Sequence, residues 1–378
     1  MYIPYGRQCI SEEDIQAVVD TLRSDYLTTG PKISEFEKVV AGYTGAKYAV
    51  AVSNGTAALH IACMAAGIGK GDEVITSPIT FVASANCAFY CGATPVFADI
   101  DINTYNISPE SIEKCITDKT RAIVAVHFSG QPCEMDKIRE IADRHNLIVI
   151  EDAAHALGAD YKGNKIGSIS DMTTFSFHPV KHITTAEGGM VTTDNKELYE
   201  KLLLYRTHGI TRNPDMLSKK DGAWYYEQTD LGYNYRITDV QCALGISQMK
   251  RLDKFVEKRR ELVNRYNEAF AEVDEIVTPY QLEGCNNSYH LYVIRFKTKD
   301  RKIVFDKLRE VGIGVNVHYI PVHTQPYYVE YYKKNGLLQP ECPNAIEYYN
   351  TAISLPLYPE LSYEQQDYVI EKVLELMS

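Results

Sequence analysis

The sequence predicts an open α/β sheet, mostly parallel, with helices on both faces, followed by a smaller α+β unit. Between about residues 45 and 195, seven short β-rich runs alternate with amphipathic helical stretches, an order typical of parallel strands joined by helical crossovers. The runs are rich in Val and Ile without polar alternation, which indicates strands that are covered on both faces. In such sheets, ligands bind at the carboxyl ends of the strands.

Each predicted strand is one of these β-rich runs. In chain order, the strands are expected within residues 48–53, 73–79, 94–100, 121–128, 147–155, 173–178 and 189–194. The helical stretches between them cover residues 55–69, 83–92, 108–117 and 134–146. Ser11 followed by Asp14 has the spacing of a capping box and predicts the start of the first helix.

The last third of the chain has a different pattern. A long helical stretch at 243–270 leads into an apolar run at 288–297, and helical patterns follow at 302–312 and 362–377. We therefore expect two domains: a large ligand-binding domain with an N-terminal arm, residues 1–250, and a small C-terminal domain, residues 251–378.

Composition and charge narrow the range of partners. The formal charge is −11, with 39 basic against 50 acidic residues, which argues against broad binding to nucleic acid or to an anionic membrane. The N-terminus lacks a basic region followed by an apolar stretch, and no apolar run reaches the ~18 residues that span a bilayer. Nine cysteines without metal-ligand spacing favour free thiols in a reducing cytoplasm, and no metal site is predicted.

One lysine stands in an unusual setting. Lys181, in FSFHPVKHITTAEGG, follows an apolar β-prone run and precedes two glycines at the expected edge of the sheet. A lysine in a loop is usually solvated, which is the simpler interpretation of this residue alone. An unprotonated lysine amine can instead form a Schiff base with the aldehyde of pyridoxal 5′-phosphate (PLP). That cofactor requires an acid at its ring nitrogen, an anion cradle for its phosphate and a flat side chain over its ring.

Each of these partners has a candidate in the sequence. Asp152 ends a buried strand, where a carboxylate gains from a cationic partner, although it could also simply cap the next helix. Asn54, Gly55 and Thr56 precede an Ala-rich helix whose first N–H groups could bind phosphate; an ordinary capped helix is the alternative. Phe81 follows a strand and could cover a ring or pack in the core. Together, in this order and spacing, they favour a PLP site.

Longer motifs carry a family resemblance. EDAAHALGA, FSFHPVKHITTAEGGMV and LGYNYRITDVQCALGISQ resemble the PLP-dependent sugar-nucleotide aminotransferases, the DegT/DnrJ group of fold type I enzymes. The likeness extends from GRQCISEEDI to the last helix, so it covers almost the whole chain. It implies the fold type I architecture, a large PLP-binding domain and a small C-terminal domain.

The resemblance implies roles for the cofactor residues. Lys181 would form the Schiff base and later move a proton, and Asp152 would hold the ring nitrogen. The other implied contacts are Gly55, Thr56 and Ser176 at the phosphate, Phe81 over the ring, and His155 at the ring oxygen. Asn234, in GYNYR, would reach the phosphate from a neighbouring subunit, which implies a homodimer with shared sites. Outside this family context, GYNYRITD would be interpreted as a polar turn before a helix.

The resemblance also implies a substrate pocket. Its residues would be Tyr5, Tyr26, Leu27, Thr28, His178, Arg236, His318, Tyr319, Ile320 and Pro321. Arg236 would suit a diphosphate because a guanidinium binds oxyanions in a bidentate manner. Packing is the simpler alternative for each tyrosine and histidine. Arg206 and His208, in RTHGI, receive no role.

The resemblance is strongest to members that act in pseudaminic acid biosynthesis. It implies transfer of an amino group from L-glutamate to C4 of UDP-2-acetamido-2,6-dideoxy-β-L-arabino-hex-4-ulose, which gives UDP-4-amino-4,6-dideoxy-N-acetyl-β-L-altrosamine. Three alternatives remain: an aminotransferase for another UDP-, GDP- or dTDP-linked keto sugar, a PLP-dependent sugar dehydratase, and a non-catalytic protein that kept the fold. Relatives that act as dehydratases tend to lack the lysine, so Lys181 argues against the second.

Overall fold

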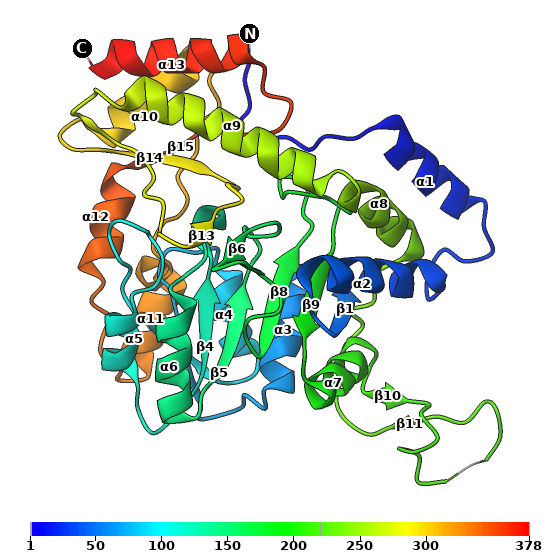
Figure 1. Ribbon diagram of the computed structural model, residues 1–378. Helices are drawn as coiled ribbons and strands as arrows, with labels where there is room; N and C mark the ends of the chain where they lie inside the picture. Colours follow the sequence, from blue (N-terminus) through cyan, green and yellow to red (C-terminus); the bar gives the residue numbers. More distant parts are fainter. Residues whose placement is uncertain (1, 220, 378) are drawn as a thin grey trace.

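A seven-stranded sheet forms the centre of the molecule (Figure 1). The computed structural model describes residues 2–219 and 221–377. The strand order is β1-β9-β8-β5-β4-β2-β3. The strands are β1 (Tyr48–Val52), β2 (Glu73–Thr76), β3 (Thr94–Phe97), β4 (Thr120–Val126), β5 (Ile148–Asp152), β8 (Met172–Ser176) and β9 (Gly189–Thr193). All seven lie at the positions that the sequence predicts, and the predicted α/β class is confirmed.

One strand runs against the others. From β8 to β3, all neighbouring strands pair in parallel, whereas β9 pairs antiparallel with both β8 and β1. The connection from β8 to β9 therefore needs no helical crossover, and residues 177–188 form a loop at the carboxyl edge of the sheet. Lys181 lies in this loop, at the edge where ligands bind in open α/β sheets.

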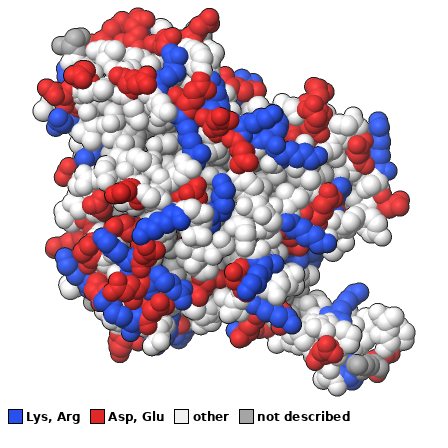
Figure 2. Space-filling model, in the orientation of Figure 1, with Lys and Arg blue, Asp and Glu red and all other residues white. Residues whose placement is uncertain are grey.

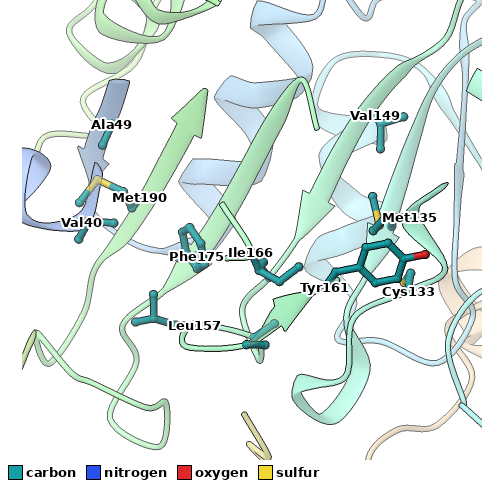
Figure 3. Close-up of a cluster of buried hydrophobic side chains, with 14 of the residues drawn as sticks. Val40, Ala49, Cys133, Met135, Val149, Leu157, Tyr161, Ile166, Phe175 and Met190 are labelled. Carbon is teal, nitrogen blue, oxygen red and sulfur yellow. The ribbon is translucent and has the colours of Figure 1, made fainter. Parts of the chain in front are cut away.

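Helices cover both faces because successive strand residues point to opposite sides. Ala49 and Ala51 of β1 face one cluster, whereas Val50 and Val52 face the other. The first cluster includes side chains from α2 (Pro31–Thr44), α5 (Pro109–Cys115), α6 (Met135–His145) and α8 (Asp239–Met249), and Figure 3 shows part of it. The second is covered by α3 (Gly55–Ala65), α4 (Ala83–Tyr90) and α7 (Lys196–Arg206).

The long helix predicted at 243–270 is two helices, so that prediction was wrong. Helix α8 ends at Met249, and α9 spans Leu252–Phe270. The amides of Lys250 and Arg251 close the last turn on carbonyls three residues back, at 3.2 and 3.0 Å, a tight geometry that does not continue an α-helix. The Arg251 side chain pairs with buried Asp14. Asp14 and Ser11 form the predicted capping box at the start of α1 (Glu12–Leu22).

The C-terminal part packs around its own small sheet. Strands β12 (Ile276–Val277), β14 (Tyr292–Phe296) and β15 (Ala352–Leu355) pair antiparallel, and α9, α10 (Arg301–Glu310) and α13 (Tyr363–Met377) enclose an apolar cluster with them. Ile3 of the N-terminal arm packs in the same cluster. The division at residues 250 and 251 stays a prediction.

The remaining elements are short. They are β6 (Asp160–Tyr161), β7 (Asn164–Lys165), β10 (Ile210–Thr211), β11 (Glu227–Gln228), β13 (Cys285–Asn286), α11 (Pro326–Lys334) and α12 (Pro343–Thr351). The segment that contains β10 and β11 stands out from the body of the molecule as an arm (Figures 1 and 2). Within residues 2–219 and 221–377, no helix combines the length and the apolar character that crossing a bilayer requires.

Candidate active site

A pocket of about 980 Å³ lies at the carboxyl edge of the large sheet. Most of the predicted cofactor residues line it: Gly55, Thr56, Phe81, Asp152, His155, Ser176 and Lys181. Four of the predicted substrate residues do so too: Tyr5, His178, His318 and Tyr319. The fold thus brings together segments from the N-terminal arm, the large sheet and the C-terminal part.

Lys181 lies partly buried in the loop between β8 and β9, where its amide donates to the carbonyl of His178 at 2.9 Å. Burial lowers the pKa of the Lys181 amine to about 8, because desolvation disfavours its charged form. The negative charge of Asp152 opposes this shift and raises the pKa of the amine. About a tenth of the amine is therefore uncharged at pH 7, far more than for an ordinary lysine, and the uncharged form is the nucleophile.

Asp152 ends β5 and is 6% exposed. One carboxylate oxygen accepts from the Ser84 hydroxyl at 2.5 Å, and the other accepts from the amide of Ala154 at 3.1 Å. These partners hold the carboxylate against the pocket without neutralising it. The sequence reasoning missed Ser84, which lies in α4 and also bonds Thr80 at 2.6 Å; its place in the SPITFVAS segment, beside Phe81, was the available signal.

The anion cradle forms at the start of α3. The Asn54 side chain accepts from the amide of Ala57 at 2.8 Å, so the amides of Gly55 and Thr56 stay at the open end of the helix. A side chain at Gly55 would place its Cβ 3.0 Å from the Cβ of Ser176, closer than such atoms pack. Glycine lets the helix start approach Ser176, and together they form a small concave site suited to a phosphate.

The His155 side chain forms hydrogen bonds both to the large-sheet part of the chain, at Ser129, and to the C-terminal part, at Tyr319. Its Nδ1 accepts from the amide of Ser129 at 3.3 Å, so the proton of the neutral ring lies on Nε2, which is 3.2 Å from the Tyr319 hydroxyl. Burial and the positive charge of Lys181 hold the pKa of His155 well below its usual range. His155 is therefore a neutral hydrogen-bond donor toward the pocket.

Asn316, His318 and Tyr319 form one side of the pocket, the C-terminal wall, which is also held in place by hydrogen bonds. Nδ1 of His318 lies 2.8 Å from the Ser354 hydroxyl, and its Nε2 lies 3.3 Å from the Asn316 amide nitrogen. Burial lowers the pKa of His318 to about 3. Asn316 and His290 line the pocket as well, with the His290 ring 4.3 Å from that of His155. The sequence reasoning named neither, although Asn316 lies two residues before the predicted His318.

The other predicted site residues lie outside this pocket. Tyr26, Leu27 and Thr28 lie near the start of α8, where the carbonyl of Leu27 accepts from the amide of Asp239 at 3.0 Å. Arg236, Ile320 and Pro321 are also absent from the lining. Asn234 is exposed, between two tyrosines that do line the pocket, Tyr233 and Tyr235. Arg206, which had no predicted role, pairs with Glu37 at 2.6 Å.

Comparison with known proteins agrees with this geometry. The model of the DegT/DnrJ/EryC1/StrS aminotransferase family matches residues 8–374. The chain belongs to this family. It is 45% identical to the spore coat polysaccharide biosynthesis protein SpsC of Bacillus subtilis over 381 aligned positions, which cover 100% of this chain and 97% of SpsC.

Two solved structures are also similar. Helicobacter pylori PseC, an aminotransferase involved in the biosynthesis of pseudoaminic acid, has a TM-score of 0.92 and 32% identity over 100% of this chain and 99% of PseC. The putative sugar aminotransferase Spr1654 of Streptococcus pneumoniae in its PMP form has a TM-score of 0.92 and 33% identity over 99% of each chain. This protein is therefore a PLP-dependent sugar aminotransferase, as the sequence predicted.

The residues of the pocket fit that cofactor. Asp152 is a buried carboxylate with no cation at ion-pairing distance among residues 2–219 and 221–377, which suits a ring nitrogen that carries a proton. The open end of α3 beside Ser176 suits a phosphate, and the depressed pKa of Lys181 suits an amine that reacts with an aldehyde.

Proposed function

We propose that the protein transfers an amino group from L-glutamate to C4 of UDP-2-acetamido-2,6-dideoxy-β-L-arabino-hex-4-ulose, giving UDP-4-amino-4,6-dideoxy-N-acetyl-β-L-altrosamine in pseudaminic acid biosynthesis. The arrangement of Lys181 and Asp152 on one pocket wall carries the transaminase chemistry. The likeness to PseC over the whole chain supports this choice of sugar.

In this proposal, the bound PLP supplies an aldehyde for Lys181 and an electron-withdrawing ring. Asp152 holds the ring nitrogen protonated, and Gly55, Thr56 and Ser176 hold the phosphate. Phe81, which lies at the pocket, covers the ring. His155 donates its Nε2 proton toward the ring oxygen, because its Nδ1 is already occupied by the amide of Ser129.

Lys181 would also act as the acid and base of both half-reactions. Its Nζ takes a proton from the α-carbon of L-glutamate, and it later returns a proton to C4 of the keto sugar. A pKa near 8 is matched to this double role, because both protonation states are then populated close to neutral pH. Loss of either proton transfer would stop turnover.

We place the substrate between the cofactor and the C-terminal wall. Tyr5, His178, His318 and Tyr319 line that side of the pocket and offer hydrogen-bonding groups to sugar hydroxyls. The pocket volume of about 980 Å³ would accommodate the cofactor and part of a nucleotide sugar. Tyr26, Leu27, Thr28, Arg236, Ile320 and Pro321 stay proposed contacts that would have to act outside this cavity or from a second copy.

The proposal includes a homodimer with shared sites. Asn234 is exposed in one chain, which is compatible with a contact to the phosphate in a second copy. The arm that carries β10 and β11 exposes apolar surface, including Trp224 at 75% and Leu231 at 67%. Such an arm gains stability when a second copy covers it. Figure 2 shows this arm standing out from a body on which acidic and basic side chains are mixed.

A cytoplasmic location completes the proposal. All nine cysteines are free thiols, which are kept reduced in that compartment. Both proposed substrates are soluble metabolites, so the reaction itself requires no membrane.

The identity to SpsC favours one second candidate. SpsC takes part in spore coat polysaccharide biosynthesis, and this chain is more similar to it in sequence, at 45%, than to PseC, at 32%. The alternative is therefore an aminotransferase of the same mechanism that acts on another nucleotide-linked keto sugar. Pocket residues decide this choice, because a single added or missing hydrogen bond changes specificity strongly.

The purified protein, with PLP and L-glutamate, separates these candidates when it is offered a panel of UDP-, GDP- and dTDP-linked keto sugars. We expect one UDP-linked product whose mass shows that an amine has replaced the keto oxygen of the sugar. NMR should show the altro configuration. Preferential amination of another sugar would support the second candidate. Loss of water without amination would contradict both.

A further inference from the structure

Lys181 lines two cavities. The first is the large pocket, and the second is a small space of about 10 Å³, which Arg7, Cys9, His182, Gln248 and Arg259 also line. Lys181 is the one residue common to both linings. The small cavity lies between the lysine loop, the N-terminal arm and helices α8 and α9, so it joins segments that are far apart in the sequence.

Arg259 is a buried cation at this cavity. It is 1% exposed, and one terminal nitrogen, Nη1, donates to the carbonyls of Tyr289, His290 and Leu357 at 3.3, 3.2 and 2.9 Å. No carboxylate of the described chain forms an ion pair with it, and desolvation lowers its pKa to about 10. Its Nε, a donor, has no hydrogen-bond partner in the part of the chain that the structure describes.

His182 lines the same cavity. It is 3% exposed, and its Nε2 lies 3.0 Å from the carbonyl of Ser288, so Nε2 carries the ring proton. Its Nδ1 is therefore an acceptor, and it too lacks a partner among the described residues. Burial and the nearby charge of Arg259 hold the pKa of His182 well below its usual range, which keeps the ring neutral.

We infer that this cavity is a binding site for one structural water molecule, which accepts from Nε of Arg259 and donates to Nδ1 of His182. A cavity needs a volume of about 10 to 15 Å³ to hold a water molecule, and the water needs at least two polar partners. The space available matches that limit, and the two partners are one donor and one acceptor, the combination that a water satisfies.

A small anion fits this site less well. It would accept from the Arg259 Nε–H, and the positive charges of Arg7 and Arg259 would attract it. However, it would also face the lone pair of His182 Nδ1 with no proton to offer, and the ring would have to be protonated next to a buried arginine. The water leaves neither group unpaired.

The bound water connects α9 to the loop that carries Lys181. His182 follows Lys181 directly, and Arg259 binds three carbonyls of the C-terminal part, so the bridge spans the joint between the two parts of the chain. The bridge therefore joins the loop that carries Lys181 to the C-terminal part, in a cavity other than the large pocket.

High-resolution crystals of the cofactor-loaded protein test this directly. We expect a fully occupied density peak within about 2.7 to 3.2 Å of both Arg259 Nε and His182 Nδ1. The absence of a peak there would overturn the inference. So would an anomalous peak in the cavity after a bromide soak, which would identify an anion site.

Two matched variants sharpen the test. In H182Q, the amide nitrogen takes the place of Nε2 and keeps the bond to Ser288, but the acceptor toward Arg259 is lost. In H182N, the amide oxygen takes the place of Nδ1 and keeps that acceptor, whereas the Ser288 bond is lost. We expect the peak to persist in H182N and to disappear in H182Q; the reverse result, or an unchanged peak in H182Q, would refute the bridge. The wild-type crystals decide the matter if a variant does not fold.

Discussion

Glu151 and Asp152 are neighbours on β5, yet their carboxylates lie on opposite sides of the sheet. Glu151 is fully buried, where its two oxygens accept from His127 Nε2 at 2.7 Å and from the Thr173 hydroxyl at 2.9 Å. Asp152 lines the large pocket and acts on the charge of Lys181.

The difference shows how one strand can carry, side by side, a carboxylate that is paired within the fold and one that faces the pocket. The donors around Glu151 are His127, directly after β4, and Thr173 in β8, so that carboxylate ties β5 to both of its neighbours. The donors around Asp152, Ser84 and Ala154, orient its carboxylate but leave its charge directed at the cavity. The side of the sheet, and not the residue type, separates the two roles.

The largest expected effect comes from removing the amine that Asp152 faces. We expect K181A to lose at least about 10³-fold in kcat, because in the proposed function Lys181 supplies both the covalent partner and the proton transfer. The near-visible absorbance of the bound cofactor should change as well, and borohydride should no longer fix the cofactor to the peptide that carries residue 181. K196A, at an exposed position on α7, is the control. Substantial turnover by K181A would refute the assignment.

Neutralising the acid on the pocket side should have the next largest effect. D152N keeps the shape and can still bond Ser84, but it no longer favours a protonated ring nitrogen. We expect kcat/KM to fall by about 10²-fold or more while circular dichroism and the Tm remain close to wild type. Steady-state kinetics and thermal unfolding on the same sample measure both quantities.

Neutralising the acid on the other side should affect stability instead. E151Q places an amide N–H₂ opposite one of two donors, His127 or Thr173, and leaves that buried group unpaired. We expect the free energy of unfolding to fall by about 1–3 kcal/mol, measured by denaturant titration, with kcat changed only a few-fold in the folded protein. A loss of kcat as large as that of D152N would break the distinction between the two faces.

The smallest expected effect is a shift on the pH axis. The rate at which cofactor-free protein captures PLP should rise with pH and level off above about 8, since the uncharged amine of Lys181 reacts. An ordinary lysine would level off near 10.5. Asp152 raises this pKa, so D152N should move the midpoint to lower pH. A midpoint that stays in place or rises in D152N would show that the charge of Asp152 does not raise the pKa of the Lys181 amine.

Local patterns in the sequence predicted much of the site. Gly55 was identified from a helix start, and in the structure a Cβ at this position would press against Ser176, which glycine avoids. Lys181 and Asp152 were identified from the ends of apolar runs, because the carboxyl ends of strands meet at one edge. Ser84 and Asn316 were not identified although they lie within three residues of Phe81 and His318, because no local pattern distinguishes them from their neighbours. His290 was not identified because it reaches the pocket from a distant segment.

The sequence by itself determined the α/β class and the places of the seven strands, because apolar periodicity and helix caps act over a few neighbouring residues. Only the tertiary structure decided that β9 runs antiparallel, that α8 and α9 are separate helices, and that Arg259 and His182 meet beside Lys181. Those features depend on contacts between residues far apart in the chain, and local sequence patterns do not indicate such contacts.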